Sequence, residues 1–218
     1  MATNYDLYGI GAALVDTEFH VSDQFLENAD IEKGVMTLVD ETRQKEILDS
    51  IAGESDDFIR KCGGSVCNSI VAAGSLGSKT FFSGKVADDI DGNTFISELA
   101  AAGVDFHNAT PEPGITGKCL VMVTVDAERT MNTFLGASAE LSKREIDESA
   151  LENSEWLYIE GYLATSVKHV EMATDTIQSA KAAGVKVALS LSDPFVAEAY
   201  KDNLRKMIGP GINLIFCN

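Results

Sequence analysis

The second half of the sequence alternates short apolar runs with longer segments of helical spacing. Strands are expected at 156–159, 185–191 and 212–216, because these runs are apolar and rich in β-branched or aromatic residues. Helices are expected at 166–183 and 195–208, each followed by a glycine. Strands and helices that alternate in this way form a parallel sheet with helices on both faces. The chain is therefore predicted to have an α/β fold.

The first half contains extended segments that fit poorly into a parallel sheet. Residues 117–126 and 129–135 are predicted to form a β-hairpin, and residues 18–36 suit edge strands or a cover over a pocket. We expect a small β lid, formed by segments near 15–38 and 115–135, inserted into the α/β core. The other expected elements are strands at 5–11, 79–83 and 104–106 and helices at 40–52, 65–75 and 92–102.

Length and composition limit the class of protein. With 218 residues, 45% of them hydrophobic, the chain can bury a sizeable core and is expected to form one domain over 1–218. Its apolar runs are too short to span a membrane, and its N-terminus lacks a basic signal region. A net charge of −17 opposes binding to nucleic acid. Scattered cysteines without metal-ligand spacing predict reduced thiols, so we expect a cytoplasmic protein.

The first glycine motif, Gly9-x-Gly11, follows the first expected strand. A dinucleotide-binding fingerprint needs a third glycine where this chain has Leu14, so a dehydrogenase is disfavoured. Asp16 lies a few residues further on, and we expect it to be exposed beside the end of that strand, where open α/β sheets bind ligands. An ionised carboxylate accepts two hydroxyl donors at once, which suits a vicinal diol. The alternative is an acidic residue in a solvated loop.

The second motif, Gly63-Gly64-Ser65, opens an expected helix. Two glycines let a ligand approach the backbone closely, and Ser65 is expected to be the N-cap. Asn68 lies on the first turn, and its amide can both donate to and accept from a sugar hydroxyl. The alternative is an ordinary turn and cap with a solvated Asn68.

The second strand of the expected hairpin places Arg129, Met131 and Thr133 on one face, because side chains alternate along a strand. This face could present a charge and an apolar surface to a ligand, or Arg129 could be an ordinary surface residue. The sequence contains no P-loop and no Gly-x-Ser-x-Gly elbow, which excludes those two routes to phosphate binding and nucleophilic catalysis.

Taken in order, several motifs resemble the ribokinase-like, phosphofructokinase-B family of carbohydrate kinases. The stretches 158–162 and 189–195 are similar to the adenosine kinase branch of that family. The resemblance implies a three-layer α/β/α core with a mostly parallel sheet and a small β lid, with the C-terminal part missing. The motifs that carry it are Gly11 to Asp16, Gly63-Gly64-Ser65-x-x-Asn68, Gly84-Lys85-Val86-Ala87-Asp88-Asp89-x-x-Gly92 and Thr116-Gly117.

The resemblance also implies a function, namely ATP-dependent phosphorylation of a primary hydroxyl of a nucleoside or sugar, with Mg²⁺ as cofactor. Asp16, Gly63, Gly64 and Asn68 would hold the sugar, and Arg129 would lie near the ribose or the incoming phosphate. Aromatic Tyr162 and Phe195 could stack on a base, which favours a nucleoside. The other residues expected to line the pocket are Met36, Met131 and Thr133.

The end of the sequence departs from the family pattern. Asn218 matches the first residue of the Asn-x-x-Glu metal and phosphate motif, and the later Asp-x-x-Gly-Ala-Gly-Asp segment is missing. That segment supplies the anion hole and the catalytic Asp, so we expect this chain alone to be inactive and to be part of a longer kinase. The alternative is a binding module that kept the pocket and lost catalysis. Pairing of lid strands between subunits is a further expectation, which would give a homodimer.

Overall fold

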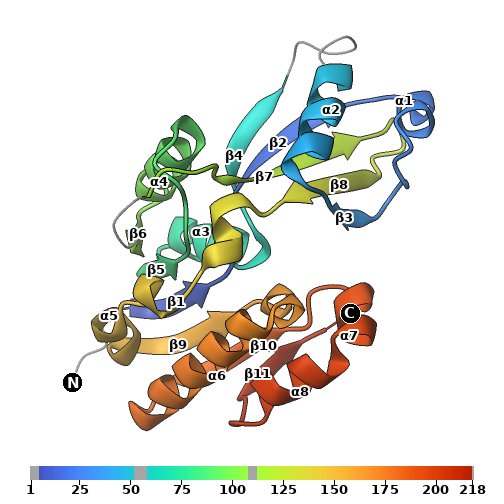
Figure 1. The fold of residues 1–218 in the computed structure, drawn as a ribbon. Helices are drawn as coiled ribbons and strands as arrows, with labels where there is room; N and C mark the ends of the chain where they lie inside the picture. The colour runs from blue at the N-terminus through green and yellow to red at the C-terminus, as the bar shows by residue number, and fades with distance from the viewer. Residues whose placement is uncertain (1–4, 52–57, 108–111, 218) are drawn as a thin grey trace.

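The computed structural model describes residues 5–51, 58–107 and 112–217, and within them the chain forms two β-sheets (Figure 1). The larger is parallel throughout, with the strand order β11-β10-β9-β1-β5-β6. Its strands are β1 (Tyr5–Ile10), β5 (Thr80–Ser83), β6 (Val104–His107), β9 (Ser154–Ile159), β10 (Lys186–Ser190) and β11 (Leu214–Phe216). This sheet confirms the predicted α/β class.

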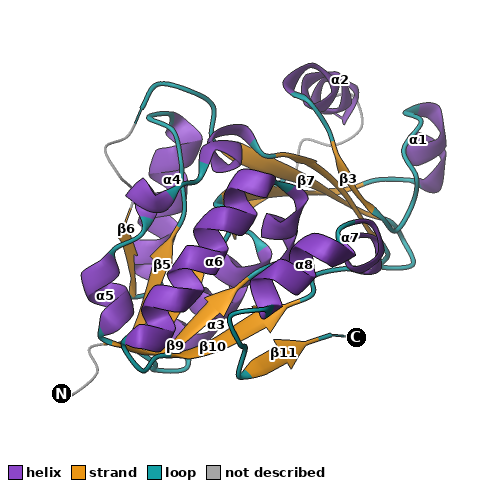
Figure 2. Cartoon of the chain, turned by 60° about the horizontal axis from the view of Figure 1, so that its bottom comes forward, coloured by secondary structure: helices purple, strands orange, loops and turns teal. Residues whose placement is uncertain are grey.

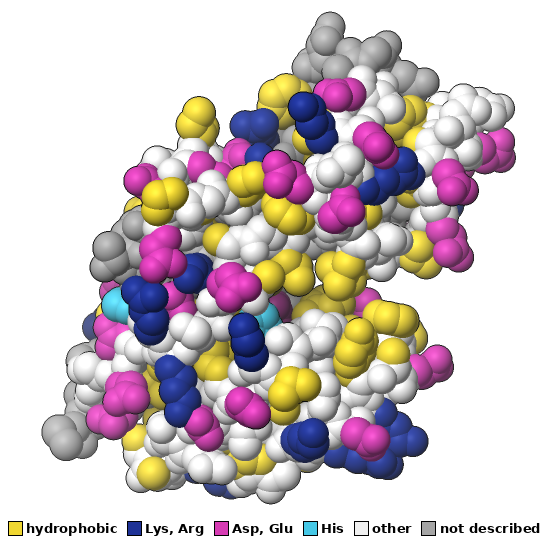
Figure 3. Space-filling model, in the orientation of Figure 1, with side chains coloured by type: hydrophobic (Ala, Val, Ile, Leu, Met, Phe, Trp, Pro, Cys, Tyr) yellow, Lys and Arg dark blue, Asp and Glu magenta, His cyan; other side chains and the backbone are white. Residues whose placement is uncertain are grey.

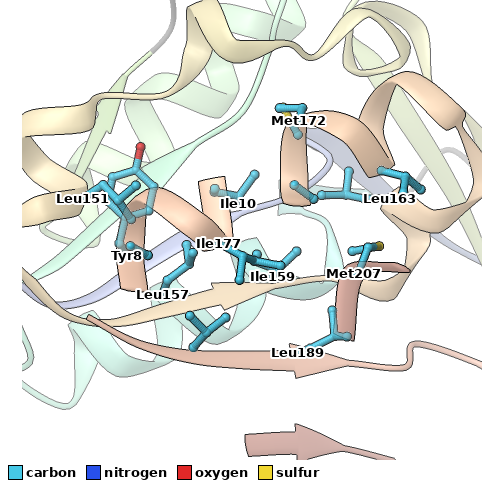
Figure 4. Close-up of a cluster of buried hydrophobic side chains, with 14 of the residues drawn as sticks. Tyr8, Ile10, Leu151, Leu157, Ile159, Leu163, Met172, Ile177, Leu189 and Met207 are labelled. Carbon is cyan, nitrogen blue, oxygen red and sulfur yellow. The ribbon is translucent and has the colours of Figure 1, made fainter. Parts of the chain in front are cut away.

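Helices cover both faces of the parallel sheet. Tyr8 and Ile10 of β1 lie in a buried cluster on one face, with side chains from the helices that cover it (Figure 4). Gly9 faces the other way, where a Cβ atom would come within 2.5 Å of Ile70. Figure 2 shows α6 lying over β9 and β10, with α8 packed beside it. The first face is covered by α5 (Glu148–Glu152), α6 (Val167–Ala182) and α8 (Lys201–Ile208), and the second by α3 (Ser65–Ser75) and α4 (Ile90–Ala101).

The second sheet has five strands of mixed direction in the order β3-β8-β7-β2-β4, and we call it the lid sheet. Its strands are β2 (Leu14–His20), β3 (Met36–Leu38), β4 (Ile59–Gly63), β7 (Gly117–Val123) and β8 (Arg129–Phe134). Helices α1 (Asp23–Asn28) and α2 (Glu41–Ile51) cover one face, where Phe19, Leu120 and Met122 are buried. The opposite face is turned toward the parallel sheet.

One sequence expectation about the elements is wrong, and a second is met only in part. The single helix expected over 195–208 is divided into α7 (Pro194–Ala199) and α8, because Tyr200 leaves the helical region at φ −116° and ψ 24°. The break lets α7 bury Val196 while α8 turns Leu204 and Met207 onto α6. The segment 18–36, expected as edge strands or a cover over a pocket, contains the end of β2, then α1, and the first residue of the edge strand β3.

Among the described residues, no helix combines the length and the apolar character needed to cross a membrane.

Candidate functional site

A cavity of about 340 Å³ lies between the lid sheet and the carboxyl ends of β1, β9 and β10. Figure 3 shows the surface hollowed on the side where the two parts of the molecule meet. Ligands of open α/β sheets bind outside the carboxyl ends of the strands, so this is the expected place for a site. Its wall includes every described residue expected from the sequence to contact substrate except Gly63, namely Asp16, Met36, Gly64, Asn68, Arg129, Met131, Thr133, Tyr162 and Phe195.

The strand register of the lid sheet sets the side of the cavity that faces the core. Asp16 pairs with Cys119, and Cys119 pairs with Thr133, so the three side chains form one row across the sheet. In the next row Val121 pairs with Met131, which pairs with Met36. Because side chains alternate along a strand, all of these lie on the face away from α1 and α2. The expected shared face of Arg129, Met131 and Thr133 is correct.

Asp16 lies in a different setting from the one expected. It is in the middle of β2, half-buried, and not in an exposed position after the first strand. Burial raises the pKa of its carboxyl to about 6, although the positive charge of Arg129 acts in the opposite direction. Burial also raises the pKa of the neighbouring Cys119 thiol to about 12, and the charge of Asp16 adds to this. Asp16 thus carries a charge at neutral pH in a site that favours a partner with hydrogen-bond donors.

The two glycines after β4 allow the chain to pass very close to its neighbours. A Cβ atom on Gly63 would lie 2.1 Å from the carboxyl carbon of Asp16. Gly64 has a φ of +106°, and a Cβ there would lie 2.2 Å from the Ala12 carbonyl oxygen. Gly63 therefore leaves the Asp16 carboxylate uncovered, and Gly64 brings the start of α3 to the cavity wall.

The expected capping role of Ser65 is wrong. Gly64 is the N-cap of α3 and makes no side-chain capping bond. The Ser65 hydroxyl instead donates to Oε2 of Glu160 at 2.8 Å. Asn68 lies on the first turn of α3, as expected, and is part of the cavity wall.

Glu160 is a site residue that the sequence reasoning missed. It follows β9 directly, is 1% exposed, and accepts hydrogen bonds from the Ala12 amide at 2.7 Å and from Ser65. Burial raises the pKa of its carboxyl, while the hydrogen bonds from Ala12, Ser65 and the Val66 amide act against the rise. A carboxylate at the start of a helix also interacts favourably with the helix dipole. Glu160 thus holds the loop after β1 against α3.

The wall opposite the lid is formed by two segments that follow β9 and β10. Tyr162 lies in the 3₁₀ helix η3 (Gly161–Thr165), and Phe195 lies in α7. Both aromatic rings line the cavity, and Phe195 is 59% exposed. The cavity wall thus combines these two aromatic residues with the polar side chains of Asp16 and Asn68.

Two further cavity residues were also missed, Ser138 and His169. The Ser138 hydroxyl donates to the Ala13 carbonyl at 2.8 Å and accepts from the Ala13 amide at 3.0 Å. His169 is 6% exposed, and its Nε2 atom has no hydrogen-bond partner among the described residues. Burial lowers the pKa of this histidine. Neither residue belongs to a recognisable motif, so only the fold identifies them.

Asn218, the expected start of a metal and phosphate motif, lies outside the described residues. Within the described ranges, no group of three or more His, Cys, Asp or Glu residues could hold a metal ion. The four cysteines are free thiols, as expected.

Comparison with known proteins identifies relatives of this architecture. Residues 35–218 match the pfkB family of carbohydrate kinases. Adenosine kinase 1 of Arabidopsis thaliana is 29% identical over 229 residues, which cover 97% of this chain and 62% of that protein. A 5-dehydro-2-deoxygluconokinase of Halalkalibacterium halodurans is 29% identical over 142 residues, covering 63% of this chain and 43% of that protein.

Solved structures of similar kinases have the same fold as this chain. The adenosine kinase from Sinorhizobium meliloti matches with a TM-score of 0.89 and 31% identity, over 98% of this chain and 64% of that one. A probable sugar kinase from Rhizobium etli matches with a TM-score of 0.88 and 29% identity, again over 98% and 64%. The chain thus spans less than two thirds of the length of these relatives. With a parallel sheet between two helical layers, a mixed lid sheet and a family match over most of its length, the chain belongs to the pfkB family of carbohydrate kinases and has the ribokinase-like fold.

Proposed function

We propose that the full-length protein is a cytoplasmic, ATP- and Mg²⁺-dependent kinase that phosphorylates the primary hydroxyl of a nucleoside. The observation that carries the proposal is one cavity whose wall combines polar Asp16 and Asn68 with aromatic Tyr162 and Phe195. A nucleoside has the matching combination of a hydroxyl-bearing sugar and a flat base. A free sugar would leave the aromatic residues without a partner.

The Asp16 carboxylate accepts hydrogen bonds from two neighbouring ribose hydroxyls. Asn68 supplies a donor and an acceptor to the same sugar. Gly63 keeps the space beside Asp16 open, and Gly64 brings the start of α3 to the cavity wall. Arg129 offsets the charge of Asp16 and lies on the lid side of the cavity. Together these residues would hold the sugar in one orientation, so that its primary hydroxyl points in a fixed direction.

The rings of Tyr162 and Phe195 offer surfaces on which a base can stack, and Met36, Met131 and Thr133 close the cavity from the lid. No cluster of His, Cys, Asp and Glu in the described part of the chain fits the Mg²⁺ ion. ATP supplies the phosphoryl group. We expect these 218 residues alone to bind the acceptor without turning it over, since they lack a Gly-Ala-Gly-Asp segment.

The test is an ADP-release assay of the full-length protein with ATP and a panel of nucleosides and sugars, with Asp16→Ala measured alongside. We expect turnover of a nucleoside, with the variant impaired mainly in KM for that nucleoside. Faster turnover of a pentose than of any nucleoside would reject the nucleoside assignment. Binding of nucleosides without turnover would reject the kinase proposal and favour a nucleoside-binding module. Pairing of two lid sheets in a homodimer is a separate proposal, which sedimentation of the same protein tests.

A further inference from the structure

Asp193 uses both of its carboxylate oxygens to connect two walls of the cavity. Oδ1 accepts from the Val196 amide at 2.8 Å, which makes Asp193 the N-cap of α7. Oδ2 accepts from the Tyr162 hydroxyl at 2.8 Å. The residue itself is absent from the cavity wall, whereas Tyr162, Phe195 and Val196 all belong to it. Asp193 therefore acts on the cavity only through the residues it holds.

The surrounding backbone keeps the two segments in contact. The Tyr162 amide donates to the Ser192 hydroxyl at 3.0 Å, and Ser192 has a φ of +67°. This left-handed conformation is unfavourable for a serine, so tertiary contacts must hold it. A Cβ atom on Gly161 would lie 2.5 Å from the Ser190 carbonyl oxygen, so only glycine permits this approach. The start of η3 is thus fixed against the connection between β10 and α7.

The hydrogen bond between the Tyr162 hydroxyl and Asp193 also decides which part of Tyr162 can meet a ligand. Its hydroxyl proton is already donated to Asp193, so Tyr162 meets a ligand through its ring and not as a hydrogen-bond donor. Burial raises the pKa of this phenol, and the hydrogen bond and charge of Asp193 raise it further. Tyr162 therefore stays a neutral donor to Asp193 over the physiological pH range.

We propose that Asp193 is a positioning residue for recognition of a planar aromatic base. One oxygen fixes the ring of Tyr162, and the other fixes the first turn of α7, which carries Phe195. The carboxylate sets the two rings relative to each other before the ligand arrives, so less free energy is lost in ordering them on binding. This inference rests on the proposed function, because it concerns the same cavity.

Two single variants remove the hydrogen bond between Asp193 and Tyr162 while they keep the N-cap of α7. Tyr162→Phe keeps the ring and the cap but removes the hydrogen bond. Asp193→Ser also keeps a good N-cap, and its short side chain does not reach Tyr162 while it caps α7. Asp193→Asn is the conservative variant, since its amide oxygen can cap α7 while its amide nitrogen donates to the tyrosine oxygen.

The measurement is steady-state kinetics of the full-length protein with adenosine and ATP. Tyr162→Phe and Asp193→Ser each remove one hydrogen bond, and we expect each to raise the KM for adenosine by about three- to tenfold. The KM for ATP and kcat should stay unchanged, and Asp193→Asn should recover most of the wild-type KM. The double variant Tyr162→Phe/Asp193→Ser should equal either single variant, because both remove the same bond.

The possible outcomes distinguish failure of the positioning role from failure of the proposed function. Unchanged KM values in both single variants, or additive effects in the double variant, would overturn the positioning role while leaving the kinase proposal intact. Equal rises in the KM for adenosine and for ATP would show a general structural effect and would also overturn it. Absence of adenosine binding and turnover in the wild-type protein would overturn the proposed function, and this inference with it.

Discussion

Asp16 is an acidic residue whose surroundings disfavour its charged form. Its carboxyl is half-buried, has an acidic neighbour in Glu18 and is only partly compensated by Arg129, and its pKa is raised to about 6. Such a group destabilises the folded chain when it is ionised, yet its ionised form is the one that accepts hydroxyl donors. Stability and substrate binding thus place opposite demands on this residue.

Replacing Asp16 with Asn is therefore expected to stabilise the fold at neutral pH. An aspartate in the unfolded chain titrates at about 4, so the folded state with its pKa of about 6 binds the proton more tightly. The favourable contribution of this group is present below about pH 4 and is lost as the pH rises through 6. The increase in melting temperature of Asp16→Asn should thus be larger at pH 8 than at pH 4.

The matched control is Glu171→Gln, which neutralises an exposed carboxylate on α6. It should change the melting temperature little at either pH. In the same preparations, Asp16→Asn should weaken nucleoside binding by about tenfold or more, since hydrogen bonds to a charged group are lost. A variant that is less stable than wild type at pH 8 would contradict this account.

At the scale of elements, close contact between the start of α3 and the loop after β1 shapes the cavity wall beside Asn68. Gly64 makes this contact possible, because any side chain there would collide with the Ala12 carbonyl. Gly77, just beyond the end of α3, also has a positive φ, +99°, but open space around it. The chain thus contains two glycines with a positive φ and different surroundings.

This pair permits a direct test of the contact. Alanine at either position costs at least about 1 kcal/mol because of the positive φ. Gly64→Ala must also displace Ala12, so we expect it to lose at least about 1 kcal/mol more than Gly77→Ala. Urea unfolding followed by circular dichroism measures both free energies of unfolding. Equal losses would mean that the loop moves aside without cost.

Most elements follow from the sequence, because periodicity reports on local structure. The strands and helices after residue 154 were predicted well, apart from the break at Tyr200, which has neither glycine nor proline to announce it. Strand β4 was not predicted at all. Three of its five residues, Ile59, Arg60 and Lys61, are exposed, two of them are charged, and the segment becomes a strand by pairing with β2. Pairing with a distant partner leaves no periodic signal.

For the whole molecule, the last strand of the parallel sheet is the most exposed. Within the described residues β11 pairs only with β10, and the exposed fractions of Leu214, Ile215 and Phe216 are 42%, 41% and 48%. An apolar edge strand is a template for pairing between chains. The 218-residue chain is therefore expected to associate with itself through this edge.

A lysine on the edge should reduce that association, because a charge must be buried when two edges pair. Ile215→Lys is thus expected to lower the light scattering of the concentrated chain and to delay its aggregation on heating. Gln178→Lys, at an exposed position of α6, makes the same change in charge at a site remote from the edge. Similar reductions in both variants would attribute the effect to net charge and not to the edge.

The sequence by itself determined the alternation of strands and helices, the glycine pair before α3 and the shared face of Arg129, Met131 and Thr133. These features depend on residues close together in the chain. Only the tertiary structure decided that Glu160 bonds to Ala12 and Ser65, which are 148 and 95 residues away. It also decided that Asp16 lies within strand β2 of the lid sheet. Local patterns specify what each segment becomes, whereas contacts between segments depend on how the two sheets pack.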